Sequence, residues 1–156
     1  MAYCLAMDIQ QSALTVRLSD GIHELQEKDA LTAAAHILRE FHPAVEYTSL
    51  AKLREEGLRV FGLVSRGRLA SVATVTYQLH VEEGRRAWVE DLITDPEKRS
   101  EGHGGELLRH VIELVHSEGT QVVMVQTRES NTSSHRFYDR VGGDHNARVY
   151  KWKKNA

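Results

Sequence analysis

The chain has 156 residues, of which 41% are hydrophobic and 27% charged, and its formal net charge at pH 7 is -2. A chain of this length buries enough apolar surface to fold without disulfides or metal ions, so we expect residues 1–156 to form a single domain. The slight negative charge argues against a general affinity for nucleic acid, which requires a concentrated basic face.

The numbers and positions of cysteine and histidine indicate the cellular compartment and limit the possible metal and disulfide chemistry. Cys4 is the single cysteine, which excludes an internal disulfide and a multi-cysteine zinc site and suits a reducing compartment. The nine histidines form no His-Glu-x-x-His pattern, so we expect no bound metal. No apolar run approaches the roughly 18 residues of a membrane span, and no secretory signal is visible. We therefore expect a cytoplasmic protein without a membrane partner.

Hydrophobic periodicity predicts ten elements in the order βααβββαβαβ. They are a strand at residues 14–18, a helix at about 29–41, a short helix at about 48–57, strands at 58–65, 68–79 and 87–94, a helix at about 104–118, a strand at 121–127, a short helix at about 132–141 and a last strand near 147–153. In the second helix we expect Leu50 and Leu53 to face inward. The run from Val122 to Val125 is typical of a strand covered on both faces.

The order of these elements indicates a mixed sheet. Residues 58–94 form a meander, which implies antiparallel pairing, whereas the strand–helix–strand unit at 87–127 implies one parallel, right-handed crossover. The predicted fold class is therefore α/β, with a mostly antiparallel central sheet, one parallel strand pair, and helices on both faces.

A glycine-rich loop between the 87–94 strand and the next helix is the most informative segment; it reads Arg99-Ser100-Glu101-Gly102-His103-Gly104-Gly105. Its glycines let a ligand approach the backbone, and the unpaired amides and dipole of a helix start attract an anion. A diphosphate is the natural ligand, to which Arg99 can add a charge-assisted contact. The loop lacks the Gly-Lys-Ser/Thr of a P-loop, and it comes too late for a dinucleotide fold. A purely structural glycine-rich turn stays open as the alternative.

Two motifs together resemble the GNAT superfamily of acetyl-coenzyme A-dependent N-acetyltransferases. The first is Arg/Gln-x-x-Gly-x-Gly/Ala, which matches Arg99 to Gly104 after a strand and a proline-containing loop. The second is similar to the family's Asn-x-x-Ala-x-x-Phe-Tyr helix and is followed by two glycines; it reads Asn131-x-x-Ser134-x-x-Phe137-Tyr138. The expected order of elements also matches that family over most of the chain.

The resemblance implies acetyl-CoA as cosubstrate and assigns it a set of binding residues. The backbone of residues 92–94 would pair with the pantetheine arm, and the amides of about residues 101–105 would hold the pyrophosphate. Asn131 would contact the pantetheine side, and Tyr138 would lie near the thioester sulfur. This requires the 87–94 and 121–127 strands to splay apart. The implied cofactor-binding residues are Leu92, Ile93, Thr94, Arg99, Ser100, Glu101, Gly102, His103, Gly104, Gly105, Asn131, Ser134 and Tyr138. Glu101 departs from the family, which often has a small or basic residue there.

Acetyl transfer to an amine requires one group to remove a proton from the amine and another to protonate the departing thiolate. By resemblance Tyr138 is the acid; its alternative role is packing beside Phe137. Residues 88–92 resemble a run in glucosamine-6-phosphate N-acetyltransferases, and on this basis Glu90 is the expected base, with a structural carboxylate as the alternative. Glu90 and Asp91 are consecutive, so we expect them on opposite faces of the strand. His80 is a second candidate base.

The acceptor pocket of this family lies between the first two helices and a late hairpin, here about residues 41–49 and 142–149. His42, Glu46, Tyr47 and Tyr77 could line it, although each also suits a surface position. The resulting hypothesis is direct acetyl transfer to a primary amine of a small molecule. Acetylation of a protein N-terminus or lysine, and a non-catalytic CoA-binding sensor, are the alternatives. Family habit alone suggests a homodimer.

Overall fold

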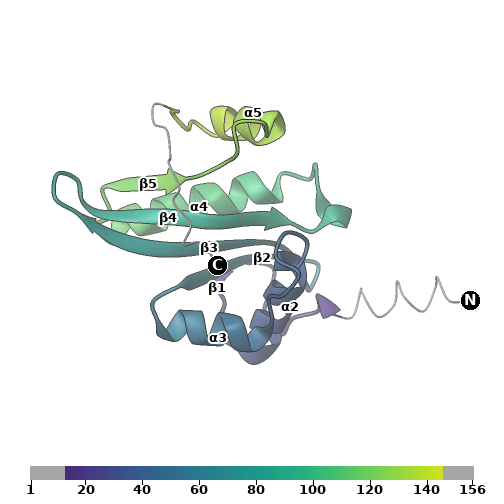
Figure 1. Ribbon diagram of the computed structural model, residues 1–156. Helices are drawn as coiled ribbons and strands as arrows, with labels where there is room; N and C mark the ends of the chain where they lie inside the picture. Colours follow the sequence, from purple (N-terminus) through teal and green to yellow (C-terminus); the bar gives the residue numbers. More distant parts are fainter. Residues whose placement is uncertain (1–12, 146–156) are drawn as a thin grey trace, which may run out of the picture.

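The computed structural model describes residues 13–145. A five-stranded sheet lies between two layers of helices (Figure 1). Helices α2 (Lys28–Leu38) and α3 (Tyr47–Glu55) cover one face, and α4 (His103–Ser117) and α5 (Thr132–Arg140) lie on the other side. None of the helices in this part of the chain is long and apolar enough to cross a membrane.

The sheet has the mixed pairing that the sequence predicts. Its strands are β1 (Gly21–Glu24), β2 (Arg59–Ser65), β3 (Arg68–His80), β4 (Gly84–Thr94) and β5 (Val122–Val125), adjacent in that order. The pairs from β1 to β4 are antiparallel, and β4 pairs with β5 in parallel. The α/β fold class is therefore confirmed.

Alternating apolar residues divide the core into two clusters, one on each face of the sheet. Val60 and Val72 pack against α2 and α3, whereas Phe61, Ala73 and Val75 pack against α4. On α4 the buried residues recur at the predicted helical spacing; they are Leu107, Leu108, Val111 and Val115. We call the two sides the α2/α3 face and the α4 face.

A β-bulge in β4 changes which side chains point to each face. Val89 lies opposite Val75 and Asp91 lies opposite Thr74, so Glu90 is an extra residue without a partner of its own on β3. Such a bulge inverts the alternation of the residues that follow it. Ile93 accordingly packs on the α2/α3 face and Leu92 on the α4 face.

β4 and β5 separate beyond the bulge. Their ladder ends at the pair Val89–Val125, whereas β4 continues to Thr94. Residues 90–94 therefore present one backbone edge that β5 does not cover. This is the splayed strand pair that the motifs require.

Two predictions at the start of the chain are wrong. Residues 14–18 form no strand: Thr15 makes an isolated bridge to Arg68, because residues 21–24 occupy the edge of β2 instead. Leu14 and Val16 of this segment are nevertheless buried in the core. Leu53 does not face inward either; it is 44% exposed, whereas Leu50 is 2% exposed.

Two further predictions concern the end of the chain. The β5 run is only half-buried rather than covered on both faces, because β5 is the edge strand of the sheet described here. The last expected strand, near residues 147–153, lies outside the described residues.

Candidate active site

The loop from Arg99 to Gly105 joins the end of β4 and the short 3-10 turn η1 (Pro96–Lys98) to the start of α4. Two of its residues have positive φ, Ser100 at 67° and Gly102 at 88°. Gly102 caps α4 without a side-chain hydrogen bond, and the first internal bond of the helix runs from the Glu106 N–H to the Gly102 carbonyl at 3.0 Å. The amides of residues 103–105 therefore have no partner within the helix and are free to bind an anion.

Gly104 is required by a close approach to β4. A Cβ at this position would lie 3.0 Å from Thr94 Oγ1, which is tighter than ordinary contact. At Gly105 a Cβ would lie 3.5 Å from Arg109 Nη1, an ordinary distance. The start of α4 can thus lie against the end of β4 because Gly104 has no side chain.

The donor pocket, as we name it, is a cavity of about 220 Å³ between the open edge of β4, the loop and α5. It brings together six of the predicted cofactor residues with Phe41 and Phe137; the six are Leu92, Ile93, Thr94, Arg99, Gly104 and Tyr138. The rings of Tyr138 and Phe137 meet edge to face at 5.2 Å. Burial raises the pKa of Tyr138 above its ordinary value, so the phenol keeps its proton at neutral pH and is able to donate it.

Arg99 and Asn131, two of the predicted cofactor residues, also make contacts inside the protein. Arg99 donates to the Thr94 carbonyl at 3.3 Å and pairs with Glu40, so it ties the loop to the chain after α2. Asn131 caps α5, because its Oδ1 accepts the Ser134 N–H at 3.1 Å.

Glu101 is the residue that departs from the family motif. Its Oε2 lies 3.2 Å from His103 Nε2. The neighbouring imidazole therefore gives the carboxylate a local partner at the rim of the loop. Ser100, Gly102, His103 and Gly105, like Glu101, belong to the loop but do not line the donor pocket.

The acceptor pocket, the second cavity, has a volume of about 620 Å³ and lies on the α2/α3 face. It shares Phe41 with the donor pocket. Its lining comes from the end of α2 and the loop after it, from α3 and Leu58, and from the bulged part of the sheet; the residues are Leu38, Phe41, His42, Pro43, Ala44, Val45, Ser49, Leu50, Leu53, Leu58, Thr74, Glu90 and Asp91.

The bulge places both carboxylates of β4 on this one face, so the prediction of opposite faces is wrong. Thr74 and Thr76 lie two residues apart on β3 and therefore share a face. Thr76 Oγ1 donates to Glu90 at 2.6 Å, and Thr74 Oγ1 donates to Asp91 at 2.6 Å. The extra residue at the bulge is the physical reason, since it turns Asp91 to the side that Glu90 already occupies.

His42 completes what we call the acceptor cluster, formed with Thr74, Thr76, Glu90 and Asp91. His42 Nε2 lies 2.7 Å from Asp91 Oδ1, and since the carboxylate accepts, the imidazole donates through Nε2. In the neutral ring, Nδ1 then carries the lone pair that can accept a proton. The sequence names His42 as a possible lining residue, but no local signal reveals its pairing with Asp91.

The other acceptor-site candidates lie elsewhere. His80 faces Gly84 at the end of the β3–β4 hairpin, and its Nδ1 accepts the Glu83 N–H at 3.3 Å. It lines neither pocket, so the structure does not support His80 as the base. Glu46 precedes α3 and Tyr47 packs against the core. Tyr77 is on the α4 face, away from the acceptor pocket.

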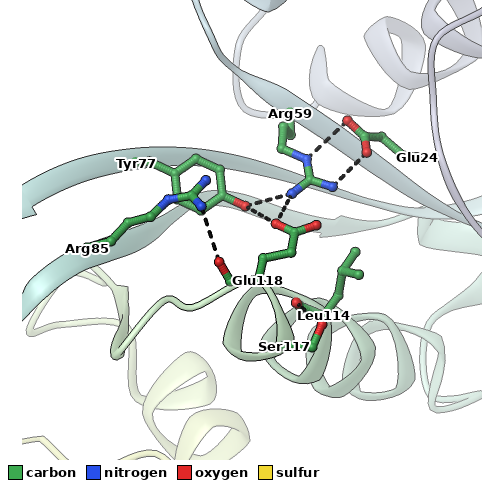
Figure 2. Close-up of polar contacts among 7 residues, drawn as sticks. All are labelled: Glu24, Arg59, Tyr77, Arg85, Leu114, Ser117 and Glu118. Carbon is green, nitrogen blue, oxygen red and sulfur yellow. Dashed lines mark hydrogen bonds and ion pairs between the residues drawn. The ribbon is translucent and has the colours of Figure 1, made fainter.

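The Arg59 cluster, formed by Glu24, Arg59, Tyr77 and Glu118, is a second polar group (Figure 2). The Arg59 guanidinium donates to both oxygens of Glu24, at 3.1 and 2.7 Å. It also donates to Glu118 at 2.6 Å and to the Tyr77 hydroxyl at 2.8 Å. The hydrogen bonds from Arg59 to Glu24 raise the pKa of Arg59, and burial raises that of Tyr77. None of these residues lines either pocket.

Within residues 13–145, no group of three or more histidine, cysteine, aspartate or glutamate side chains could hold a metal ion. The side chains that line the two pockets and can exchange a proton include Tyr138, His42, Glu90 and Asp91. Tyr138 can give a proton in one pocket, and Glu90 or His42 can take one in the other.

Comparison with known proteins agrees with this geometry. The model of the Acetyltransferase (GNAT) family matches residues 21–143. An uncharacterized N-acetyltransferase from Bacillus subtilis (strain 168), YhdJ, is 25% identical over 93 residues, which cover 59% of this chain and 66% of that protein, just under two thirds of its length.

Solved structures show the same fold at low identity. An acetyltransferase from Trypanosoma brucei superposes with a TM-score of 0.72 at 22% identity, over 85% of this chain and 98% of that one. The aminoglycoside acetyltransferase meta-AAC0020, from an uncultured soil metagenomic sample, gives 0.73 at 16% identity, over 86% and 95%.

AAC(6')-Iy, bound to the bisubstrate analogue CoA-S-monomethyl-acetylneamine, gives a TM-score of 0.74 at 19% identity, over 86% of this chain and 97% of that one. GNAT acetyltransferases use acetyl-CoA as their acyl donor. With the family model matching most of its length, the chain belongs to the GNAT family of acetyltransferases.

Proposed function

We propose that this protein transfers the acetyl group of acetyl-CoA directly to a primary amine of a small molecule. The observation that carries the proposal is the meeting of two pockets at Phe41, across the bulged part of β4. Tyr138, which keeps its proton at neutral pH, lines the donor pocket, and the carboxylates of Glu90 and Asp91 line the acceptor pocket. Substrates held in both at once can react without a covalent intermediate on the enzyme.

The donor side holds the cosubstrate through backbone groups. The amides of residues 101–105 bind the pyrophosphate, and the open edge of residues 92–94 pairs with the pantetheine arm. Asn131 and Ser134 lie along that arm. The single negative charge of Glu101 is turned to His103, which lowers its repulsion toward the diphosphate.

The reaction requires one proton to leave the amine and one to reach sulfur. The amine nitrogen attacks the thioester carbon, and the C–N bond forms as the C–S bond breaks. An amine that arrives as its ammonium loses a first proton to solvent; Glu90 then takes the second proton, from the attacking nitrogen, and Tyr138 gives its proton to the sulfur. A thiolate whose thiol has a pKa near ~8.5 is a fair leaving group, so an acid as weak as a phenol suffices.

Calorimetry with acetyl-CoA, followed by thiol release with amines, tests the proposal. We expect binding, and thiol released in the same amount as acetylated amine. Binding without turnover of any amine would favour a CoA-binding sensor. Faster acetylation of peptides than of any small amine would favour a protein acetyltransferase.

Location and assembly belong to the same proposal. We infer that the protein is cytoplasmic, because its single cysteine suits a reducing compartment. We also infer that it is a homodimer, because members of this family are often dimeric. Sedimentation equilibrium measures the mass in solution. A mass of twice 17.6 kDa would support the dimer, and a mass of 17.6 kDa would contradict it.

A further inference from the structure

The acceptor pocket combines an apolar wall with few charges. Phe41 and Leu53, 64% and 44% exposed, are two of the large apolar side chains that the described residues leave exposed, and both line this pocket. Leu38, Val45 and Leu58 extend the wall. Apolar side chains gathered in a concave site mark a surface that an apolar ligand covers.

The charged groups on the other side are acidic and partly satisfied. Asp91 already accepts hydrogen bonds from Thr74 and His42. Glu90 accepts the Thr76 hydroxyl through Oε1. Glu90 is therefore the carboxylate best able to receive an ammonium group from a ligand.

Basic residues are missing from the lining that the structure describes. Among residues 13–145, no lysine or arginine lines the pocket, and His42 is the one basic side chain that does. Within this described lining, a phosphate or carboxylate on the acceptor would meet His42 as its one basic neighbour and would lie near Glu90 and Asp91. Like charges at such short range disfavour binding. Anionic amines, including sugar phosphates, are therefore poor candidates.

We propose that the acceptor is a primary amine with a single positive charge on an apolar alkyl or arylalkyl body. This inference rests on the proposed function, and it names the class of amine that the acceptor pocket selects. The ammonium group lies at Glu90, and the body lies against Phe41, Leu53 and their neighbours. Polycationic amines would leave further charges against apolar side chains, which is unfavourable.

An amine panel tests the inference. The panel contains n-alkylamines from propyl to octyl, 2-phenylethylamine, spermidine, neamine and glucosamine 6-phosphate, each assayed for thiol release and, without acetyl-CoA, for binding by calorimetry. We expect kcat/KM to rise about fourfold per added methylene until the pocket is filled. The monoamines should exceed the polycations and the sugar phosphate at least tenfold.

The outcomes separate this inference from the proposed function. If neamine, spermidine or the sugar phosphate is fastest, or if rate is independent of chain length, the inference is wrong while acetyl transfer stands. If alkylamines bind with the expected dependence on length but none is acetylated, the inference survives and the proposed function fails. If no amine binds or reacts, both are overturned.

A pair of variants locates the effect. Leu53→Asp places a negative charge in the apolar wall, and we expect it to lower kcat/KM for hexylamine at least tenfold relative to that for spermidine. Leu79→Asp is the matched control, because Leu79 is 91% exposed and lines neither pocket. An unchanged amine preference in Leu53→Asp, with the protein folded, would contradict the proposed position of the apolar body.

Discussion

The two faces of one sheet carry polar clusters of different kinds. In the Arg59 cluster, one guanidinium contacts two carboxylates and a hydroxyl. The Cζ atom of Arg85 lies 3.9 Å from the centre of the Tyr77 ring, on which its guanidinium stacks. In the acceptor cluster, two carboxylates contact two hydroxyls and one imidazole. Both of these carboxylates line a cavity. The first cluster is satisfied within the protein, whereas the second retains capacity for a ligand. A polar group with unused bonding capacity in a cavity is what distinguishes a site from a structural network.

Removing the charge of Glu90 should have the largest effect. We expect Glu90→Gln to lower kcat/KM about a thousandfold, because an amide cannot take the proton from the amine. The free energy of unfolding should change little, since the amide can still accept from Thr76. Steady-state kinetics and thermal melts measure both quantities. Glu82→Gln, on the exposed β3–β4 turn, is the control. Full activity in Glu90→Gln with a large loss in His42→Gln would transfer the role of base to His42.

Tyr138→Phe should have the next largest effect. We expect kcat to fall about a hundredfold, since only the proton donor is removed. Burial raises the pKa of Tyr138, so the acid stays protonated past the ordinary tyrosine value of about 10, and the loss of activity as pH rises should begin above that value. A pH–rate profile checks this, and the variant should lack that alkaline decline. An unaltered kcat would leave Tyr138 a packing residue beside Phe137.

Arg59→Met breaks the other cluster and should affect stability alone. Glu24, Tyr77 and Glu118 would lose their shared donor. We expect a loss of about 2 kcal/mol in the free energy of unfolding, as for hydrogen bonds to charged groups. Urea unfolding measures this loss, and kcat/KM at a temperature where the variant is folded should equal that of the parent protein. A selective loss of activity in the folded variant would join this cluster to the site.

Gly104→Ala should have the smallest effect. The added Cβ would lie 3.0 Å from Thr94 Oγ1, so either the Thr94 side chain or the loop must move by a few tenths of an ångström. We expect about a fivefold weaker affinity for acetyl-CoA, the equivalent of about 1 kcal/mol of overpacking. Gly105→Ala is the matched control, since its Cβ meets nothing closer than 3.5 Å. Calorimetry compares the two, and equal affinities would show that the close approach does not position the loop.

The part of the site that depends on local patterns could be predicted from the sequence. The loop from Arg99 to Gly105 is recognised by its glycines and its place before a helix, and the structure brings its Arg99 and Gly104 to Tyr138. Each of these inferences uses residues close together in the chain. Element order followed in the same way from hydrophobic spacing.

The part that depends on strand register could not be predicted. Nothing in the residues around Glu90 signals that β3 and β4 pair with one residue to spare, so Asp91 was expected on the wrong face. The pairing of Asp91 with His42 joins residues 49 positions apart and follows from that same bulge. Leu53 is exposed because it lines a cavity instead of packing into the core.

A crystal structure with coenzyme A and a bound alkylamine tests the central claim most directly. The account predicts the pyrophosphate on the amides of residues 101–105, the sulfur beside the Tyr138 hydroxyl, and the amine at Glu90 in the acceptor pocket. The Arg59 cluster should be unchanged and without ligand. Coenzyme A bound away from this loop, or an amine bound on the α4 face, would contradict the account.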